Sequence, residues 1–103
     1  MMRWYLIHTK PSSETIASRN LSRQGYEVYL PRMVQRVLRA GVIRERISPL
    51  FPRYLFLHVR EGCQSLRPVG SSVGVTAVVR FGSTYPVVPD SVIHGLRARE
   101  DRE

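Results

Sequence analysis

PLFPRYLF, residues 49–56, combines two prolines with alternating aromatic residues and leucines. Its two prolines each fix φ and form a tight turn, and the alternating aromatic residues and leucines that follow predict a β-strand. Successive side chains of a strand point to opposite faces, so Tyr54 and Phe56 share one face and Leu55 and Leu57 the other. A small domain has one core, to which the leucine face can contribute. The aromatic face therefore either packs beneath another element or binds a partner.

Length and composition predict one compact domain. A chain of 103 residues with 43% hydrophobic content can bury a core but is too short to divide into domains. We expect a single sheet with helices packed on it, an α+β fold. Cys63 is the one cysteine, so an intrachain disulfide is excluded, and no apolar run approaches the ~20 residues of a membrane span. The apolar run near the N-terminus is too short for a signal peptide, and a cytoplasmic protein is expected.

The chain has a formal net charge of +8, and the excess lies in its first half. Residues 1–60 contain eleven Lys or Arg and three Asp or Glu, whereas residues 61–103 contain five of each. Fifteen of the sixteen basic residues are arginine, whose planar guanidinium suits phosphates and base edges better than lysine does. This composition favours a nucleic-acid partner. A solvated basic surface or a patch for an acidic protein are the alternatives.

The first 25 residues predict a strand and a helix. Residues 4–9 are apolar and β-prone, and the following segment, residues 13–24, begins with a serine suited to the N-cap and ends before Gly25. Arg19 and Arg23 lie one turn apart and opposite the apolar positions of this helix. These two arginines predict an outward basic ridge.

A long basic hairpin follows a second predicted strand at residues 26–32. Residues 33–48 form two β-prone arms that turn near Ala40-Gly41, with four arginines and one glutamate on the arms. A core this small cannot pack against a long hairpin over its whole length, so we expect the hairpin to project from the domain. Charges that keep an edge strand from aggregating are the alternative explanation.

The second half predicts three further elements and a tail. A short helical turn is expected within residues 60–72, a strand over residues 75–82, and a helix over residues 90–99 after Pro89. Residues 100–103 are polar and predict the start of a linker.

The sequence predicts binding rather than catalysis. GSSVG, residues 70–74, matches the pattern of a hydrolase nucleophile elbow at Ser72, but that elbow needs a strand before it and a helix after it in a larger fold. The histidines at positions 8, 58 and 94 have no ligand-like spacing, and Cys63 adds no metal pair. No metal and no cofactor are expected.

Four segments together resemble the N-terminal (NGN) domain of NusG-type transcription elongation factors, and most of all the RfaH branch of specialised NusG paralogues. The segments are WYLIHTK at residues 4–10, the predicted helix with Ala17 and Leu21, PLFPRYLF, and VVRFGSTYPVVPDSVI at residues 78–93. The resemblance implies an NGN domain over residues 1–99, an RNP-like, mainly antiparallel sheet flanked by helices. It also implies a C-terminal KOW domain after the linker, which is absent from this chain and which in the RfaH branch can refold and mask the docking surface.

The resemblance implies two main partners. The domain docks on the clamp helices of the RNA polymerase β′ subunit, and it contacts single-stranded or hairpin DNA of the non-template strand. The matching polymerase-binding residues are Phe51, Pro52, Tyr54, Phe56, Phe81, Ile93 and Leu96. The matching DNA-binding residues are Lys10, Arg19, Asn20, Arg23 and Gln24.

A third contact is implied with the gate loop of the polymerase β subunit. The RfaH branch makes it through a His-Thr-Thr motif, and the corresponding positions here are Ser65, Leu66 and Arg67. The chain's own C-terminal domain is a further implied partner, and a monomer in the bacterial cytoplasm is expected.

Three classes of function are compatible with these features. The favoured one is a non-enzymatic elongation or antitermination domain that suppresses pausing. The alternative is a free-standing single-stranded RNA-binding module, because aromatic residues on a sheet face can stack bases, although RYLFLHV lacks the glycine and the aromatic spacing of that signature. An adaptor for an acidic protein is a third, weaker hypothesis.

Overall fold

The computed structural model describes residues 1–101 and shows seven strands, two α-helices and one short 3₁₀ turn. The predicted α+β class is confirmed. The elements in chain order are β1 Met2–Thr9, α1 Glu14–Arg23, β2 Glu27–Tyr29, β3 Arg32–Arg39, β4 Val42–Pro49, β5 Tyr54–Arg60, the 3₁₀ turn Val69–Ser71, β6 Val75–Val78, β7 Val87–Val88 and α2 Asp90–Asp101.

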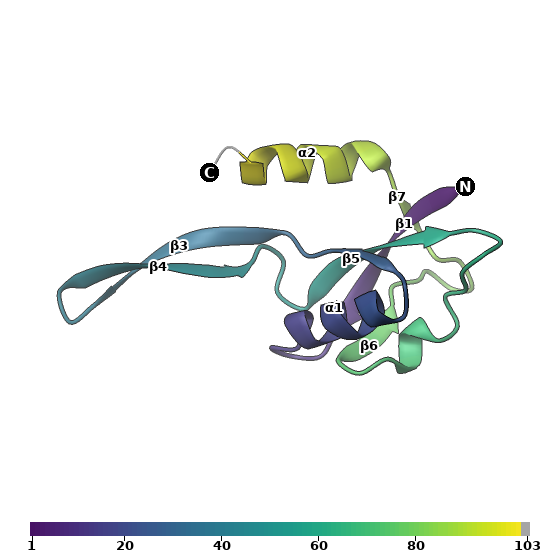
Figure 1. Ribbon diagram of the computed structural model, residues 1–103, viewed down its shortest axis with the longest axis horizontal. Helices are drawn as coiled ribbons and strands as arrows, with labels where there is room; N and C mark the ends of the chain where they lie inside the picture. The colour runs from purple at the N-terminus through teal and green to yellow at the C-terminus, as the bar shows by residue number, and fades with distance from the viewer. Residues whose placement is uncertain (102–103) are drawn as a thin grey trace.

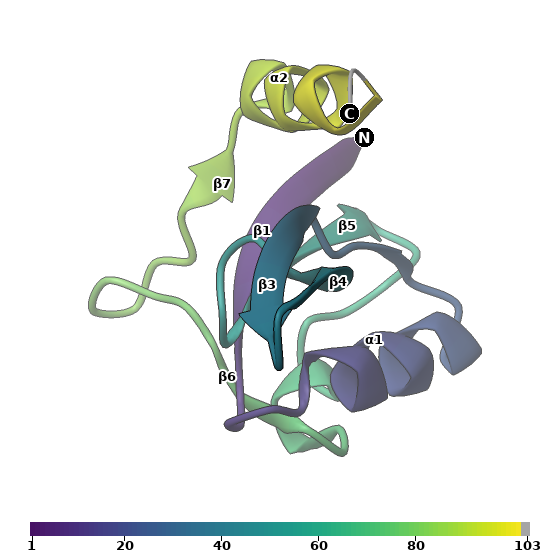
Figure 2. The same cartoon turned by 90° about the vertical axis from the view of Figure 1, so that its left-hand side faces the viewer.

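Five strands form an antiparallel sheet in the order β2-β5-β1-β6, with β7 also paired to β1. Strand β1 lies inside the sheet, where its apolar side chains are covered on both faces, and it pairs with β5 from Met2 to His8 and with β6 and β7 on its other side. The helices cover opposite faces of this sheet, with α1 on one side and α2 on the other (Figure 1, Figure 2).

The main core lies between α1 and the leucine face of β5. Ala17 and Leu21 of α1 are fully buried against Leu55 and Leu57, as the helical and strand periodicities predict. Gly25 ends the helix with φ of +95°, a conformation that glycine adopts at no steric cost.

The start of α1 differs from the prediction in its side-chain contacts. Ser13 is the N-cap residue, but its hydroxyl donates to the Pro11 carbonyl oxygen and makes no bond to the helix. Glu14 is buried in the first turn, and its carboxylate accepts a 2.9 Å hydrogen bond from the Arg53 amide. This carboxylate therefore anchors the turn before β5 in addition to favouring the helix N-terminus.

The hairpin β3–β4 forms as predicted and projects from the body (Figure 1). Its two-residue turn, Ala40-Gly41, has positive φ at both positions, which is the geometry that matches the twist of the flanking strands. The projection gives the molecule extents of 53 × 28 × 27 Å.

The structure differs from the predicted elements at three boundaries and at one strand. The second strand, predicted over residues 26–32, is limited to Glu27–Tyr29, because Pro31 has no amide N–H for the ladder and Arg32 already begins β3. The strand expected over residues 75–82 ends at Val78, because the chain then turns at a bridge between Phe81 and Thr84. Strand β7 was not predicted, since two residues carry no periodic signal. Helix α2 extends to Asp101, past the expected end at residue 99, and the rest of the expected linker, residues 102–103, lies outside the described residues. Neither α-helix of residues 1–101 is long and apolar enough to cross a membrane.

Candidate functional site

The aromatic face of the sheet is the face that α2 partly covers. Strand β5 pairs with β1 so that three rows cross this face, namely His58 with Trp4, Phe56 with Leu6, and Tyr54 with His8. Trp4 and Phe56 are buried in a cluster with Ile93 of α2, and Tyr54 and His8 are not members of that cluster. The end of the face that carries Tyr54 is therefore open.

The structure separates the predicted polymerase-binding residues into buried and exposed ones. Phe56 and Ile93 are 6% and 1% exposed, because Ile93 of α2 packs on Phe56 and both belong to the core between the helix and the sheet. Tyr54 and Phe51 are 36% and 41% exposed. The Phe51 ring contacts Phe56 edge-on at 6.4 Å between centroids, and the Tyr54 ring stacks on His8 at 5.0 Å. Phe51, Pro52 and Tyr54 together form what we call the aromatic patch.

The other two predicted residues lie apart from this patch. Leu96 is half-buried on α2, where it packs against the Trp4 cluster and faces the base of the hairpin. Phe81 is 75% exposed on the loop after β6, and none of the ring contacts within residues 1–101 involves it. The fold thus brings Phe51, Pro52 and Tyr54 together and leaves Phe81 separate.

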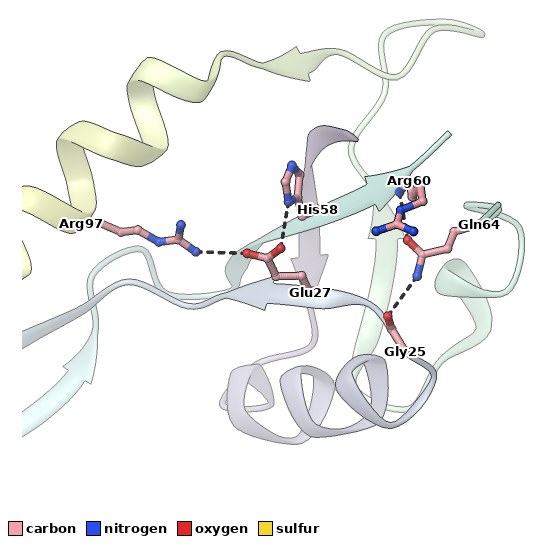
Figure 3. Close-up of polar contacts among 6 residues, drawn as sticks. All are labelled: Gly25, Glu27, His58, Arg60, Gln64 and Arg97. Carbon is pink, nitrogen blue, oxygen red and sulfur yellow. Dashed lines mark hydrogen bonds and ion pairs between the residues drawn. The ribbon is translucent and has the colours of Figure 1, made fainter. Parts of the chain in front are cut away.

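Helix α2 is fastened to the sheet by a polar contact network that the sequence did not predict (Figure 3). Glu27 of β2 accepts hydrogen bonds from His58 Nδ1 at 3.0 Å and from Arg97 of α2 at 3.5 Å. The hydrogen bond from His58 holds the pKa of Glu27 below its usual range and outweighs the opposing effect of burial; Arg97 contributes in the same direction.

Aromatic rings complete this attachment. The Arg97 guanidinium lies 4.8 Å from the Tyr29 ring centroid and 5.4 Å from that of Trp4, and the Trp4 and His58 rings are stacked 4.1 Å apart. The Tyr29 hydroxyl donates to the Glu100 carboxylate. The two-residue periodicity of a strand could have predicted that Trp4 lies on the aromatic face. The α2 residues that contact it are distant in the sequence, so no local pattern predicts them.

The predicted basic ridge is present on α1. Lys10, Arg19 and Arg23 are exposed, and none of them has an ion pair within the described part of the chain. Asn20 and Gln24 are partly engaged, since the Asn20 amide donates to the Ile16 carbonyl oxygen at 3.0 Å and the Gln24 amide donates to Ser72 at 2.8 Å. The ridge therefore presents cations that can bind an anion, beside two side-chain amides whose orientation is held by hydrogen bonds.

Ser65, Leu66 and Arg67 line a surface cleft of about 530 Å³ together with Arg80 and Tyr85. The Tyr26 hydroxyl donates to the Ser65 carbonyl oxygen, and this tyrosine is buried, which raises its pKa. The segment is thus held against the core while its side chains face the cleft.

The arrangement suits binding and offers no catalytic constellation. Ser72 accepts from Gln24 and donates to the Pro68 carbonyl oxygen, a structural role in the loop. Within residues 1–101, no group of His, Cys, Asp or Glu side chains could hold a metal ion. Trp4 and Phe56 are buried beneath α2, so most of the aromatic face is not accessible for stacking with RNA bases.

Comparison with known proteins identifies the family. The sequence matches the family described as "Transcription termination factor nusG" over residues 2–97, nearly the whole chain. The chain therefore belongs to the NusG family, whose members are transcription factors and not enzymes.

The fold is also similar to a solved structure, "Domain interaction in Thermotoga maritima NusG", with a TM-score of 0.66 and 18% sequence identity. The match covers 93% of this chain and 55% of that chain, so this chain spans about half the length of that protein. At this identity the likeness concerns the fold alone.

Proposed function

We propose that this chain is the polymerase-docking domain of a NusG-type elongation and antitermination factor of the RfaH kind, acting in the bacterial cytoplasm. It docks on the β′ clamp helices through the aromatic patch. A factor that binds the closed clamp shifts the polymerase population away from paused states without any chemical step. The observation that supports this proposal most is the exposed aromatic patch in a chain of the NusG family, beside a core that α2 already completes.

The aromatic patch has the properties of an interface centre. Phe51 and Tyr54 are exposed aromatic side chains, the residue type that dominates binding energy when it fills a partner's apolar pocket. Both rings are held in place, Phe51 by Phe56 and Tyr54 by His8. Pre-positioned rings lose little conformational freedom on binding, which favours affinity.

Two further contacts belong to the proposal. The basic ridge of α1 binds the exposed non-template DNA strand. Arg19 and Arg23 on α1 and Lys10 just before it are exposed cations without an ion pair in the described part of the chain, and the helix is too firmly braced against the sheet to enter a duplex groove. Asn20 and Gln24 each keep an amide oxygen for base edges. The cleft at Ser65, Leu66 and Arg67 is the place for the β gate loop.

Pull-down of core RNA polymerase tests the docking. The double variant Phe51→Ala/Tyr54→Ala should bind roughly 30-fold more weakly, because loss of a central anchor costs about 2 kcal/mol. Ile43→Ala is the matched control, an exposed apolar residue on β4 that belongs to none of the proposed contact surfaces, and it should bind like the wild type. Undiminished binding by the double variant, with an unchanged circular dichroism spectrum, would rule out docking through this patch.

A further inference from the structure

A groove of about 500 Å³ separates α1 from the base of the hairpin. Thr15, Ser18 and Arg19 of α1 line one side, and Arg32 of β3 and Ser48 of β4 lie across from them. Figures 1 and 2 both place α1 beneath the base of the hairpin, so the groove joins segments that are distant in the sequence.

The chemistry of this groove suits an anion. Its lining contains two arginines and three hydroxyl groups and no carboxylate. Neither Arg19 nor Arg32 has an ion pair among residues 1–101, and both are exposed. An arginine fork binds phosphate oxygens with two hydrogen bonds, and serine and threonine hydroxyls are common phosphate ligands. Leu30 and Ile47 add apolar surface, which a sugar or base can cover.

The groove also continues the basic ridge. Arg19 belongs both to the ridge and to the groove lining, so an extended strand that crosses α1 can pass from Lys10 and Arg23 to Arg32. A single-stranded nucleic acid carries successive phosphates that several of these cations can bind at once, whereas an isolated phosphate would need only one of these arginines.

We propose that the groove between α1 and the hairpin base binds the phosphodiester backbone of a single-stranded nucleic acid that also crosses the basic ridge. The occupant is a single strand because the groove lies between a helix and a hairpin and is too small for a duplex. This inference rests on the DNA contact proposed for α1 and extends it to Arg32, Thr15, Ser18 and Ser48.

Fluorescence anisotropy with a labelled single-stranded oligonucleotide at several salt concentrations tests the groove. Arg32→Ala should weaken binding about tenfold, the effect of losing a charged hydrogen bond, and should reduce the slope of log affinity against log salt by about 0.7. Arg32→Lys should keep most of the salt slope, because the charge remains, and lose part of the affinity.

Arg36→Ala is the matched control. Arg36 lies on the same hairpin and on the same face as Arg32, but it does not line the groove, so its loss should change neither affinity nor slope. Equal losses from Arg36→Ala and Arg32→Ala would mean diffuse attraction by the hairpin and would overturn the site.

The remaining outcomes distinguish failure of the groove proposal from failure of the DNA contact proposed for α1. Loss of binding in Arg23→Ala but not in Arg32→Ala would overturn the groove and leave the α1 contact standing. Unchanged binding in both would overturn the groove and the α1 contact together. Weaker polymerase binding by Arg32→Ala with unchanged oligonucleotide affinity would mean that a protein segment occupies the groove, which also overturns the proposal. Because Arg23, Arg32 and Arg36 are all exposed, these variants should fold.

Discussion

Phe56 and Tyr54 are two residues apart on the same face of β5, yet the structure gives them different roles. Phe56 is enclosed by Trp4 and Ile93, whereas Tyr54 stacks on His8 at the open end of the face. Their surroundings differ because α2 covers only part of the face. A side chain's chemistry therefore does not decide whether it stabilises the fold or binds a partner.

The Phe56→Ala variant should show this difference at the level of single residues. It should lower the free energy of unfolding by about 3 to 5 kcal/mol, since it removes a buried ring and leaves a cavity. Tyr54→Ala should lower it by less than about 1 kcal/mol, because the Tyr54 ring is partly solvated. Urea denaturation followed by circular dichroism measures both values. Equal stability losses would place the two rings in equivalent environments and contradict the burial pattern.

At the scale of elements, the fold depends on one close approach between α1 and the loop before β6. Gly74 has φ of +87°, and a Cβ atom there would lie 2.9 Å from the Ala17 backbone nitrogen and 3.2 Å from its Cα. The Gly74 carbonyl oxygen also accepts a 2.9 Å hydrogen bond from the Lys10 amide. The loop thus fixes the start of α1, and with it the position of the basic ridge.

Gly74→Ala should destabilise the fold by roughly 3 kcal/mol, from backbone strain and the clash with α1 together. Gly62→Ala is the matched control, because Gly62 has nearly the same φ, +84°, and nothing within 4 Å of the added Cβ. It should cost only about 1 kcal/mol, the strain alone. Thermal unfolding of the two variants separates the cost of backbone strain from the cost of the clash with α1. A Gly74→Ala protein as stable as Gly62→Ala would show that α1 can move away at little cost.

At the scale of the whole molecule, α2 is a layer that touches the sheet through few side chains. Ile93 supplies the buried contact, and Arg97 joins the helix to Glu27 of β2 (Figure 3). Stability of the complete fold should therefore respond to the charge of Glu27. Because the folded-state pKa of Glu27 is lower than its ordinary value of 4.5, its contribution is present above that pH and is lost as the pH falls through the folded-state pKa.

Glu27→Gln should lower the free energy of unfolding at pH 7 by less than about 1 kcal/mol, since the Glu27 side chain is half exposed and solvent screens its partners. The difference from the wild type should vanish in acid, well below pH 4.5, where the native carboxyl is protonated. Denaturant titrations at both pH values measure this. Glu45→Gln, which removes a carboxylate without an ion pair in the described chain, should show no difference at either pH. A Glu27→Gln deficit that persisted in acid would indicate a packing effect instead.

The sequence by itself determined the features that depend on neighbours along the chain. Helix α1, strands β1 and β5 and the projecting hairpin follow from periodicity, from Gly25 and from the Ala40-Gly41 turn, because backbone preferences act over a few residues. The concentration of positive charge in residues 1–60 was also readable directly. These local properties were sufficient to predict the α+β fold and the basic ridge.

Which element covers each face of the sheet depends on tertiary packing. The period of two shows that Tyr54 and Phe56 share a face, but it carries no information about α2, whose residues lie more than 30 positions away in the chain. For the same reason Arg97 on Glu27, Glu14 beneath Arg53, and the groove between Arg19 and Arg32 had no sequence signal. Burial and long-range contacts arise from how elements pack, and packing brings together side chains that no local pattern connects.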